Sequence, residues 1–302
     1  MNRPFRPVGP NDLSAAPITI TTAHGVRLHG IQTGVLAIKQ AHAHLQGIEA
    51  LRLPAIVLDR NWTALLPMIA WVIEHPEGLI VVDTGEIAAA NDIDSYMACD
   101  PNNRWFYKRN LPLFISPREE LGAQMQVLGL DPAAVRTVIL THLHGDHTGG
   151  LGFFPNAEFL VARREYEGHL RQPYGAVRCL WPSFFKPTLL DYTGPALDAF
   201  SASHTVTKAG DLVVVPTPGH SYGHQSVLLR DGAHTYMLAG DLAFREQQLL
   251  ESGLQGIAYN TSEARQTLQQ VQRYIAQHPT IFLPSHDPVT LTRLAHKAVT
   301  RL

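Results

Sequence analysis

The sequence predicts an α/β protein that folds as one layered domain over residues 1–302. Composition is the first reason: 45% of the residues are hydrophobic and 17% are charged, which is typical of a globular chain and not of a disordered one. Short apolar, β-branched runs interspersed with stretches of helical spacing are the second. The length exceeds that of a usual domain, but large α/β folds reach it as one unit.

The predicted strands are short apolar runs that end in turn residues or in histidine and aspartate. They lie at Gly78–Thr84, Thr137–Leu140, Glu158–Ala162, Leu212–Val215, Gln225–Leu229, Thr235–Ala239 and Ile281–Leu283. The fifth and sixth of these runs predict a hairpin, because residues 230–233 between them form a turn-like Arg-Asp-Gly-Ala sequence.

Apolar residues at helical spacing predict a helix at Glu119–Leu128, and another between Ala264 and Ile275 with Ser262 as its cap. A further helix is expected after the strand that ends at residue 162. Residues 1–16 are expected to form a loose arm. Residues 92–117, rich in asparagine, aspartate, proline and aromatic residues, are expected to form a long irregular segment.

Charge and apolar content exclude several classes of partner and location. The formal net charge is -2 without a long run of one sign, so neither nucleic acid nor a membrane surface is an expected partner. No signal-like or membrane-spanning apolar stretch is visible, which predicts a cytoplasmic protein. Cys99 and Cys179 are the two cysteines, and we expect buried, reduced thiols.

Residues 142–147 read His-Leu-His-Gly-Asp-His and directly follow a predicted strand. Imidazole nitrogens and carboxylate oxygens together suit zinc and related divalent cations. His220, Asp241 and His286 also follow predicted strands, where loops display side chains on a rigid frame. We therefore expect one site with two divalent metal ions, most simply zinc, and Asp241 as the bridging carboxylate.

Most of the other histidines are expected to be ordinary core or surface residues. His42 and His44 have the spacing of a ligand pair but no acid follows them, so a metal role is disfavoured. His224, close to His220, is a weaker candidate for supporting a ligand from behind.

Residues 141–150 resemble the signature of the metallo-β-lactamase superfamily, and the resemblance extends roughly from residue 65 to residue 290. Further matches are Asp83–Gly85, Thr217–His220, Gly240–Asp241 and Ser285–Asp287. Within the superfamily, the sequence is most similar to N-acyl homoserine lactone lactonases, the quorum-quenching group. Residues 162–167, residues 217–226 and the spacing from His220 to Asp241 to His286 carry that finer similarity.

The resemblance implies an αβ/βα four-layer sandwich with two metals at one edge. It assigns His142, His144 and His220 to the first metal. It assigns Asp146, His147 and His286 to the second metal, and makes Asp241 the bridge.

The implied reaction is opening of the lactone ring by a hydroxide that bridges the metals, with Asp146 carrying a proton to the leaving oxygen. One position departs from the pattern. Lactonases of this group commonly have a tyrosine three residues after the bridging aspartate, where its hydroxyl positions the substrate carbonyl. This sequence has Phe244, a substrate-binding candidate whose ring cannot donate a hydrogen bond.

Several alternatives stay open at this point. A thioesterase of the glyoxalase II kind or another ester hydrolase shares the framework, and a metal-binding redox or sensor protein is a weaker alternative. Apolar walls for an acyl chain could come from the aromatic residues Trp105, Phe106, Phe114, Trp181, Phe184 and Phe185. A homodimer is a further hypothesis, since residues 104–116 fit a subunit contact as well as a lid.

Overall fold

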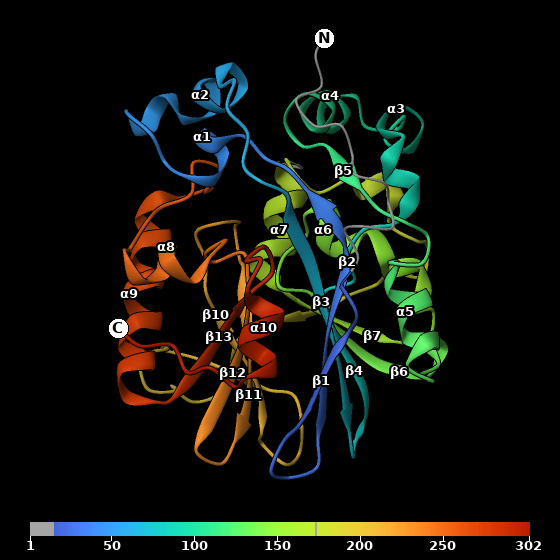
Figure 1. The fold of residues 1–302 in the computed structure, drawn as a ribbon, viewed down its shortest axis with the longest axis vertical. Coiled ribbons are helices and arrows are strands. Elements are labelled where there is room, and N and C mark those ends of the chain that lie inside the picture. The colour runs from blue at the N-terminus through green and yellow to red at the C-terminus, as the bar shows by residue number, and fades with distance from the viewer. Residues whose placement is uncertain (1–14, 173) are drawn as a thin grey trace.

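The computed structural model describes residues 15–172 and 174–302, and its strands form two sheets that face each other (Figure 1). The first sheet has the order β1-β2-β3-β4-β6-β7-β8, with β5 paired to β2. Its strands are β1 (Ile18–Thr21), β2 (Arg27–Leu36), β3 (Leu66–His75), β4 (Gly78–Val82), β5 (Leu113–Phe114), β6 (Val135–Ile139), β7 (Glu158–Ala162) and β8 (Thr188–Leu190). Neighbours from β1 to β4 are antiparallel, and those from β4 to β8 are parallel.

The second sheet has the order β13-β12-β11-β10-β9. Its strands are β9 (His204–Thr205), β10 (Leu212–Pro216), β11 (Gln225–Asp231), β12 (His234–Gly240) and β13 (Thr280–Pro284). The predicted hairpin is present as β11 and β12, and β13 is parallel to β12.

Alternating side chains in each strand hold the layers together. In β10, Leu212 and Val214 face the core between the two sheets. Val213 and Val215 point to the other side and pack with Leu268 of helix α9 (Thr261–Gln277). Each such side chain contributes roughly 1.5–3 kcal/mol when it is fully buried.

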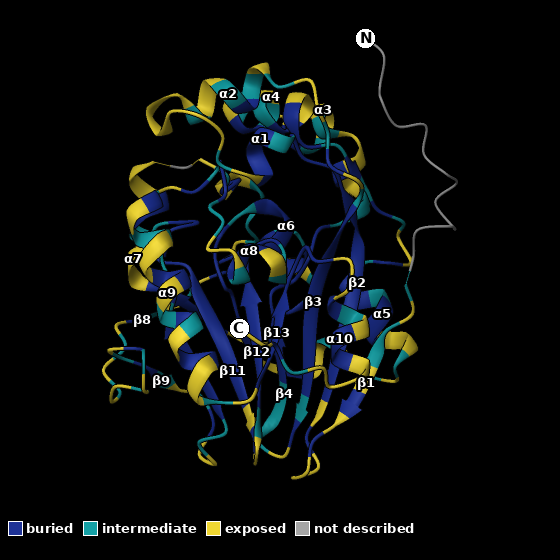
Figure 2. Cartoon of the chain, turned by 60° about the vertical axis from the view of Figure 1, so that its left-hand side comes forward, coloured by how far each residue is buried: buried dark blue, intermediate teal, exposed yellow. Residues whose placement is uncertain are grey.

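Helix α5 (Leu121–Val127) covers the outer face of the first sheet in the same way, through apolar side chains that meet β3, β4 and β6. The layers are therefore helix, sheet, sheet and helix, and the predicted αβ/βα four-layer sandwich is confirmed (Figures 1 and 2). The remaining α-helices of the sandwich are α6 (Gly145–Thr148), α7 (Arg163–Arg171), α8 (Glu246–Leu250) and α10 (Thr290–Ala295). No helix in the part of the chain that the structure describes has the length and apolarity to span a membrane.

Short helices form a cap at the end of the sandwich (Figure 2). They are α1 (Gln40–Ala43), α2 (Arg52–Leu58), α3 (Ile93–Tyr96) and α4 (Pro101–Asn110). An apolar cluster joins this cap to the sandwich, and it includes Ala43, Met97 and Tyr107 from the cap and Phe244 from the loop after β12.

Two expectations about helices were wrong. Residues 92–117 are not irregular, because they contain α3, α4 and β5. Asp92 and Asp100 cap the two helices through their carboxylates, and Pro101 occupies the first position of α4. Helix α9 is capped by Asn260, not by Ser262, since the Asn260 side chain accepts the backbone N–H of Glu263. Residues 1–14 of the expected loose arm lie outside the described residues.

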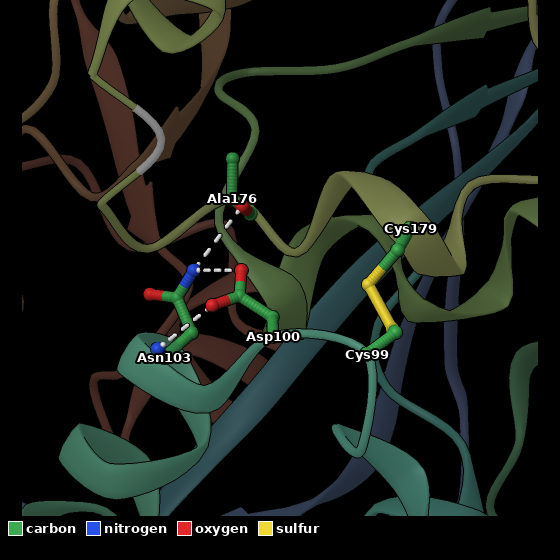
Figure 3. Close-up of a disulfide and its surroundings, with 5 residues drawn as sticks. All are labelled: Cys99, Asp100, Asn103, Ala176 and Cys179. Carbon is green, nitrogen blue, oxygen red and sulfur yellow. Dashed lines mark hydrogen bonds between the residues drawn. A yellow bond between two sulfur atoms is a disulfide. The ribbon is translucent and has the colours of Figure 1, made fainter.

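The cysteines form a disulfide, which corrects the expectation of buried, reduced thiols. Cys99 and Cys179 are both exposed, and they join the cap before α4 to the segment around residue 178 (Figure 3). Beside the disulfide, Asn103 donates to the Ala176 carbonyl and accepts from the Gly175 N–H. The bridge therefore fastens residues 175–179 to the cap.

Replacing both cysteines by serine is expected to lower the free energy of unfolding by about 2–4 kcal/mol. The closed loop is long, with 80 residues of separation, so the bridge removes much freedom from the unfolded chain. Urea unfolding of wild type and the double variant measures the difference. Reduced wild type should behave like the double variant, and equal stability of all three would contradict the prediction.

Candidate metal centre

All seven predicted ligands gather at the ends of strands, below the helical cap. His142 and His144 follow β6, and Asp146 and His147 lie in α6. His220, Asp241 and His286 follow β10, β12 and β13. All of them are buried except His144, which is half-buried.

The first group consists of three imidazoles, those of His142, His144 and His220. His144 Nδ1 lies 3.0 Å from His142 Nε2 and 3.1 Å from His220 Nε2. Tetrahedral zinc with bonds of about 2.0–2.1 Å separates its ligand atoms by roughly 3.3 Å, so the spacing fits a cation. Burial lowers the pKa of His142 and of His144 well below the ordinary value, which keeps these rings neutral with lone pairs to offer.

The second group consists of Asp146, His147 and His286. Asp146 Oδ2 lies 3.3 Å from His286 Nε2 and 3.7 Å from His147 Nε2. Imidazole and carboxylate at these separations again match the ligand set of a divalent cation.

Asp241 lies between the two groups. Its Oδ2 is 3.5 Å from His220 Nε2 in the first group and 3.3 Å from His286 Nε2 in the second. Gly240, with a φ of 55°, turns the chain directly before Asp241. A side chain at residue 240 would collide with His224, which explains the glycine. One carboxylate thus reaches both groups, as a bridging ligand must.

The polar atoms of the cluster fit two bound cations better than they fit each other. His147 Nε2 and Asp241 Oδ1 face each other at 3.4 Å without a hydrogen bond, although both are shielded from solvent. Burial opposes the charge on His147, but Asp241 and Asp83 outweigh it and raise the pKa well above the ordinary value. The carboxylates therefore stabilise positive charge at this position. Bound metal ions would supply that charge in place of protons.

A surrounding set of residues orients the ligands by binding their second nitrogen. Asp83 Oδ2 lies 2.8 Å from His147 Nδ1, and Gln255 Oε1 lies 2.6 Å from His220 Nδ1. His286 Nδ1 donates to the Pro67 carbonyl at 2.7 Å. With Nδ1 engaged, each of these rings presents Nε2 to the cluster.

His224 lies behind Asp241, where the sequence analysis considered a supporting role for it. Its Nε2 accepts the backbone N–H of Asp241 at 2.9 Å, and its Nδ1 lies 2.9 Å from Thr217 Oγ1. Sequence reasoning missed Gln255, because a single glutamine in a loop carries no signal of its partners.

Glu165 of α7 is a second residue that the sequence prediction did not single out. The fully buried carboxylate accepts the backbone N–H of Leu143 at 3.0 Å and that of Gly223 at 2.7 Å. It also binds Ser221 Oγ and His169 Nε2, at 2.7 and 2.9 Å. One side chain thereby joins the loop of His142 and His144 to the loop of His220.

Replacing Glu165 by glutamine is expected to cost about 3 kcal/mol of stability at pH 7. Burial would raise the pKa of Glu165, but His169 and the hydrogen bonds lower it to about 2. A carboxyl with a lowered folded-state pKa stabilises the fold above its ordinary pKa of 4.5, and the effect disappears as the pH falls through about 2. Urea unfolding of metal-stripped protein at pH 7 and pH 3 tests this. Glu167→Gln, on the surface of the same helix, serves as control, and an equal cost at both pH values would contradict the prediction.

Phe244, the candidate for substrate binding, lies next to the histidine cluster. Its ring centroid lies 5.8 Å from that of His220 and 5.4 Å from that of His286. Trp181 and Phe185, two of the other aromatic candidates, instead pack on the outer face of the first sheet.

Comparison with known proteins identifies the family of the chain. Residues 69–286 match the model of the metallo-beta-lactamase superfamily. N-acyl homoserine lactonase AttM of Rhizobium radiobacter is 30% identical over 236 residues, which cover 74% of this chain and 82% of AttM. N-acyl homoserine lactonase of Bacillus thuringiensis is 25% identical over 229 residues, with the same coverage.

Solved structures show the same fold. An N-acyl homoserine lactone hydrolase with the product N-hexanoyl-L-homoserine at its catalytic metal centre has a TM-score of 0.69 and 19% identity, covering 91% of this chain and 95% of its own. AidC, a dizinc quorum-quenching lactonase, has a TM-score of 0.63 and 16% identity, with 92% of each chain covered. The chain belongs to the metallo-β-lactamase superfamily, as a hydrolase similar to its N-acyl homoserine lactonases.

Proposed function

We propose that this protein opens the lactone ring of N-acyl homoserine lactones with two divalent metal ions, most simply zinc. The observation that carries the proposal is the pair of ligand groups joined by Asp241, which reaches both within 3.5 Å. The AttM and Bacillus relatives, named as N-acyl homoserine lactonases, support this choice of substrate.

Metals bound to the two groups would allow a water molecule to ionise near neutral pH, and they would polarise the ester carbonyl. Addition of one water to that carbonyl breaks the ring C–O bond and yields an acid and an alcohol. The proton given up by the water must reach the departing oxygen.

Asp146 is the residue that we assign to this transfer. It is buried beside His147 and His286; burial favours the protonated form, but these two neighbours lower the pKa to about 2. The carboxylate is therefore ionised at neutral pH and accepts the proton before passing it on. In the same proposal, Asp241 holds both metals and Phe244 provides an apolar wall beside them.

Two wider expectations stay predictions. A homodimer is consistent with exposed apolar side chains on the cap, such as Leu58 and Trp105, and sedimentation would test it. The expectation of reduced thiols no longer supports a cytoplasmic location, because disulfides such as that between Cys99 and Cys179 are typical of oxidising compartments.

A substrate panel tests the proposed function. Zinc-loaded protein is assayed with N-acyl homoserine lactones of short, medium and long chains, with a glutathione thioester and with a simple aryl ester. We expect kcat/KM for the best lactone to exceed that for the thioester and the aryl ester. Preference for the thioester would overturn the lactonase proposal and favour the thioesterase alternative.

A further inference from the structure

His42 is a buried histidine that no role in the metal cluster accounts for. It lies in α1 of the cap and is 5% exposed. Its Nδ1 is shielded from solvent and has no hydrogen-bond partner in the described residues 15–172 and 174–302. A buried polar atom left without a partner costs stability, so its presence in a folded core calls for an explanation.

His42 lies close to the candidate metal centre, with one aromatic ring in between. Its ring centroid lies 6.1 Å from that of Phe244 and 6.2 Å from that of Phe106. Phe244 in turn contacts the rings of His220 and His286. His42 is thus one aromatic ring away from both ligand groups, on the side of the cap.

Helix α1 is held in place by Gln248, which also binds Phe244, and by Gly256, which adjoins the Gln255 that binds His220. Gln248 accepts the backbone N–H of Phe244 at 2.8 Å and donates to the Ala43 carbonyl at 2.7 Å. Gly256, next to the Gln255 that binds His220, donates its N–H to the His42 carbonyl at 3.0 Å. A glycine is needed there, because a Cβ at residue 256 would lie 1.8 Å from the Ala41 carbonyl oxygen. Helix α1 is therefore fixed relative to Phe244 and His220.

The chemical state of His42 suits a hydrogen-bond donor. Burial, together with nearby His220, lowers its pKa to about 3, although Asp146 and Asp241 oppose the shift. The ring is therefore neutral and carries one N–H and one acceptor nitrogen. Phe244, the neighbouring wall of the site, has no donor to offer a substrate oxygen.

We propose that His42 is a substrate-positioning residue, which donates a ring N–H to an oxygen of the substrate ester held over the metal centre. This inference rests on the proposed function for the identity of the ester. A preorganised donor of this kind acts most strongly where negative charge develops during the reaction.

The test compares His42→Phe, His42→Asn and His44→Phe, each loaded with zinc, on N-hexanoyl homoserine lactone. His42→Phe keeps a ring but removes the donor, and should lower kcat/KM on the order of 10- to 100-fold. His42→Asn restores an N–H near the position of Nδ1 and should recover part of the loss. His44→Phe, a change of an exposed histidine two residues further on, should behave like wild type.

Metal content and product binding separate positioning from a structural role. All variants should retain two zinc ions per chain, and His42→Phe should bind the ring-opened product N-hexanoyl homoserine about 10-fold more weakly by calorimetry. The inference is overturned if His42→Phe matches wild type in kcat/KM and in product binding. It is also overturned if both His42 variants lose their zinc or no longer fold. If wild type opens no lactone, the proposed function fails instead, and the same variant ratios on p-nitrophenyl butyrate decide whether His42 positions an ester.

Discussion

Replacing Asp241 by asparagine is expected to abolish tight metal binding and activity together. The change keeps the shape of the side chain but removes one of the two carboxylates, Asp146 and Asp241, in the candidate ligand groups. Removing a residue that only orients a ligand typically costs 10- to 100-fold in metal affinity or activity, so loss of the bridge should cost more, at least about 100-fold. Elemental analysis after desalting and kcat/KM for a lactone measure both effects.

Asp231→Asn is the matched control for this variant. Asp231 is a buried aspartate at the other end of the β11–β12 hairpin, where it accepts the Ala23 N–H at 2.7 Å. It should retain both metals and full activity. If Asp241→Asn also kept two metals and full activity, Asp241 would not be the bridge.

Removal of the metals is the second change with a large expected effect, in this case on stability. The native cluster brings three carboxylates, Asp83, Asp146 and Asp241, together with five imidazoles. In the proposed function only the folded state offers this set of ligands to the cations. At free zinc a thousand times above the dissociation constant, each site adds about 4 kcal/mol to the free energy of unfolding. For a chain of this size, chelation should therefore lower the melting temperature by roughly 10 °C or more.

Thermal unfolding with and without a chelator measures this shift, and added zinc should reverse it. In Asp241→Asn the chelator should have a much smaller effect, since little metal is bound beforehand. If the melting temperature of wild type changed with neither chelator nor zinc, this would contradict a metal centre in the folded protein.

The cluster of the candidate metal centre could be predicted from the sequence because its signals are local. His142, His220, Asp241 and His286 each follow an apolar run, and strand ends of one sandwich meet at one edge. The long strands β2 and β3 were not predicted, and the helices within 92–117 were missed although the Asp100-Pro101 pair is a local start signal.

The residues around the ligands were not accessible for a physical reason. Glu165 and Gln255 are ordinary residue types, and their significance comes from partners far along the chain, such as the contact of Glu165 with Gly223. The same holds for the disulfide, because two cysteines 80 residues apart carry no local signal of pairing.

Titration of zinc into metal-stripped protein, with lactone ring opening as the readout, tests the central claim most directly. A centre of two groups joined by Asp241 predicts negligible turnover of N-hexanoyl homoserine lactone without metal and full turnover at two zinc ions per chain. Turnover by the metal-free protein would contradict the claim. So would a protein that binds two zinc ions and opens no lactone of any chain length.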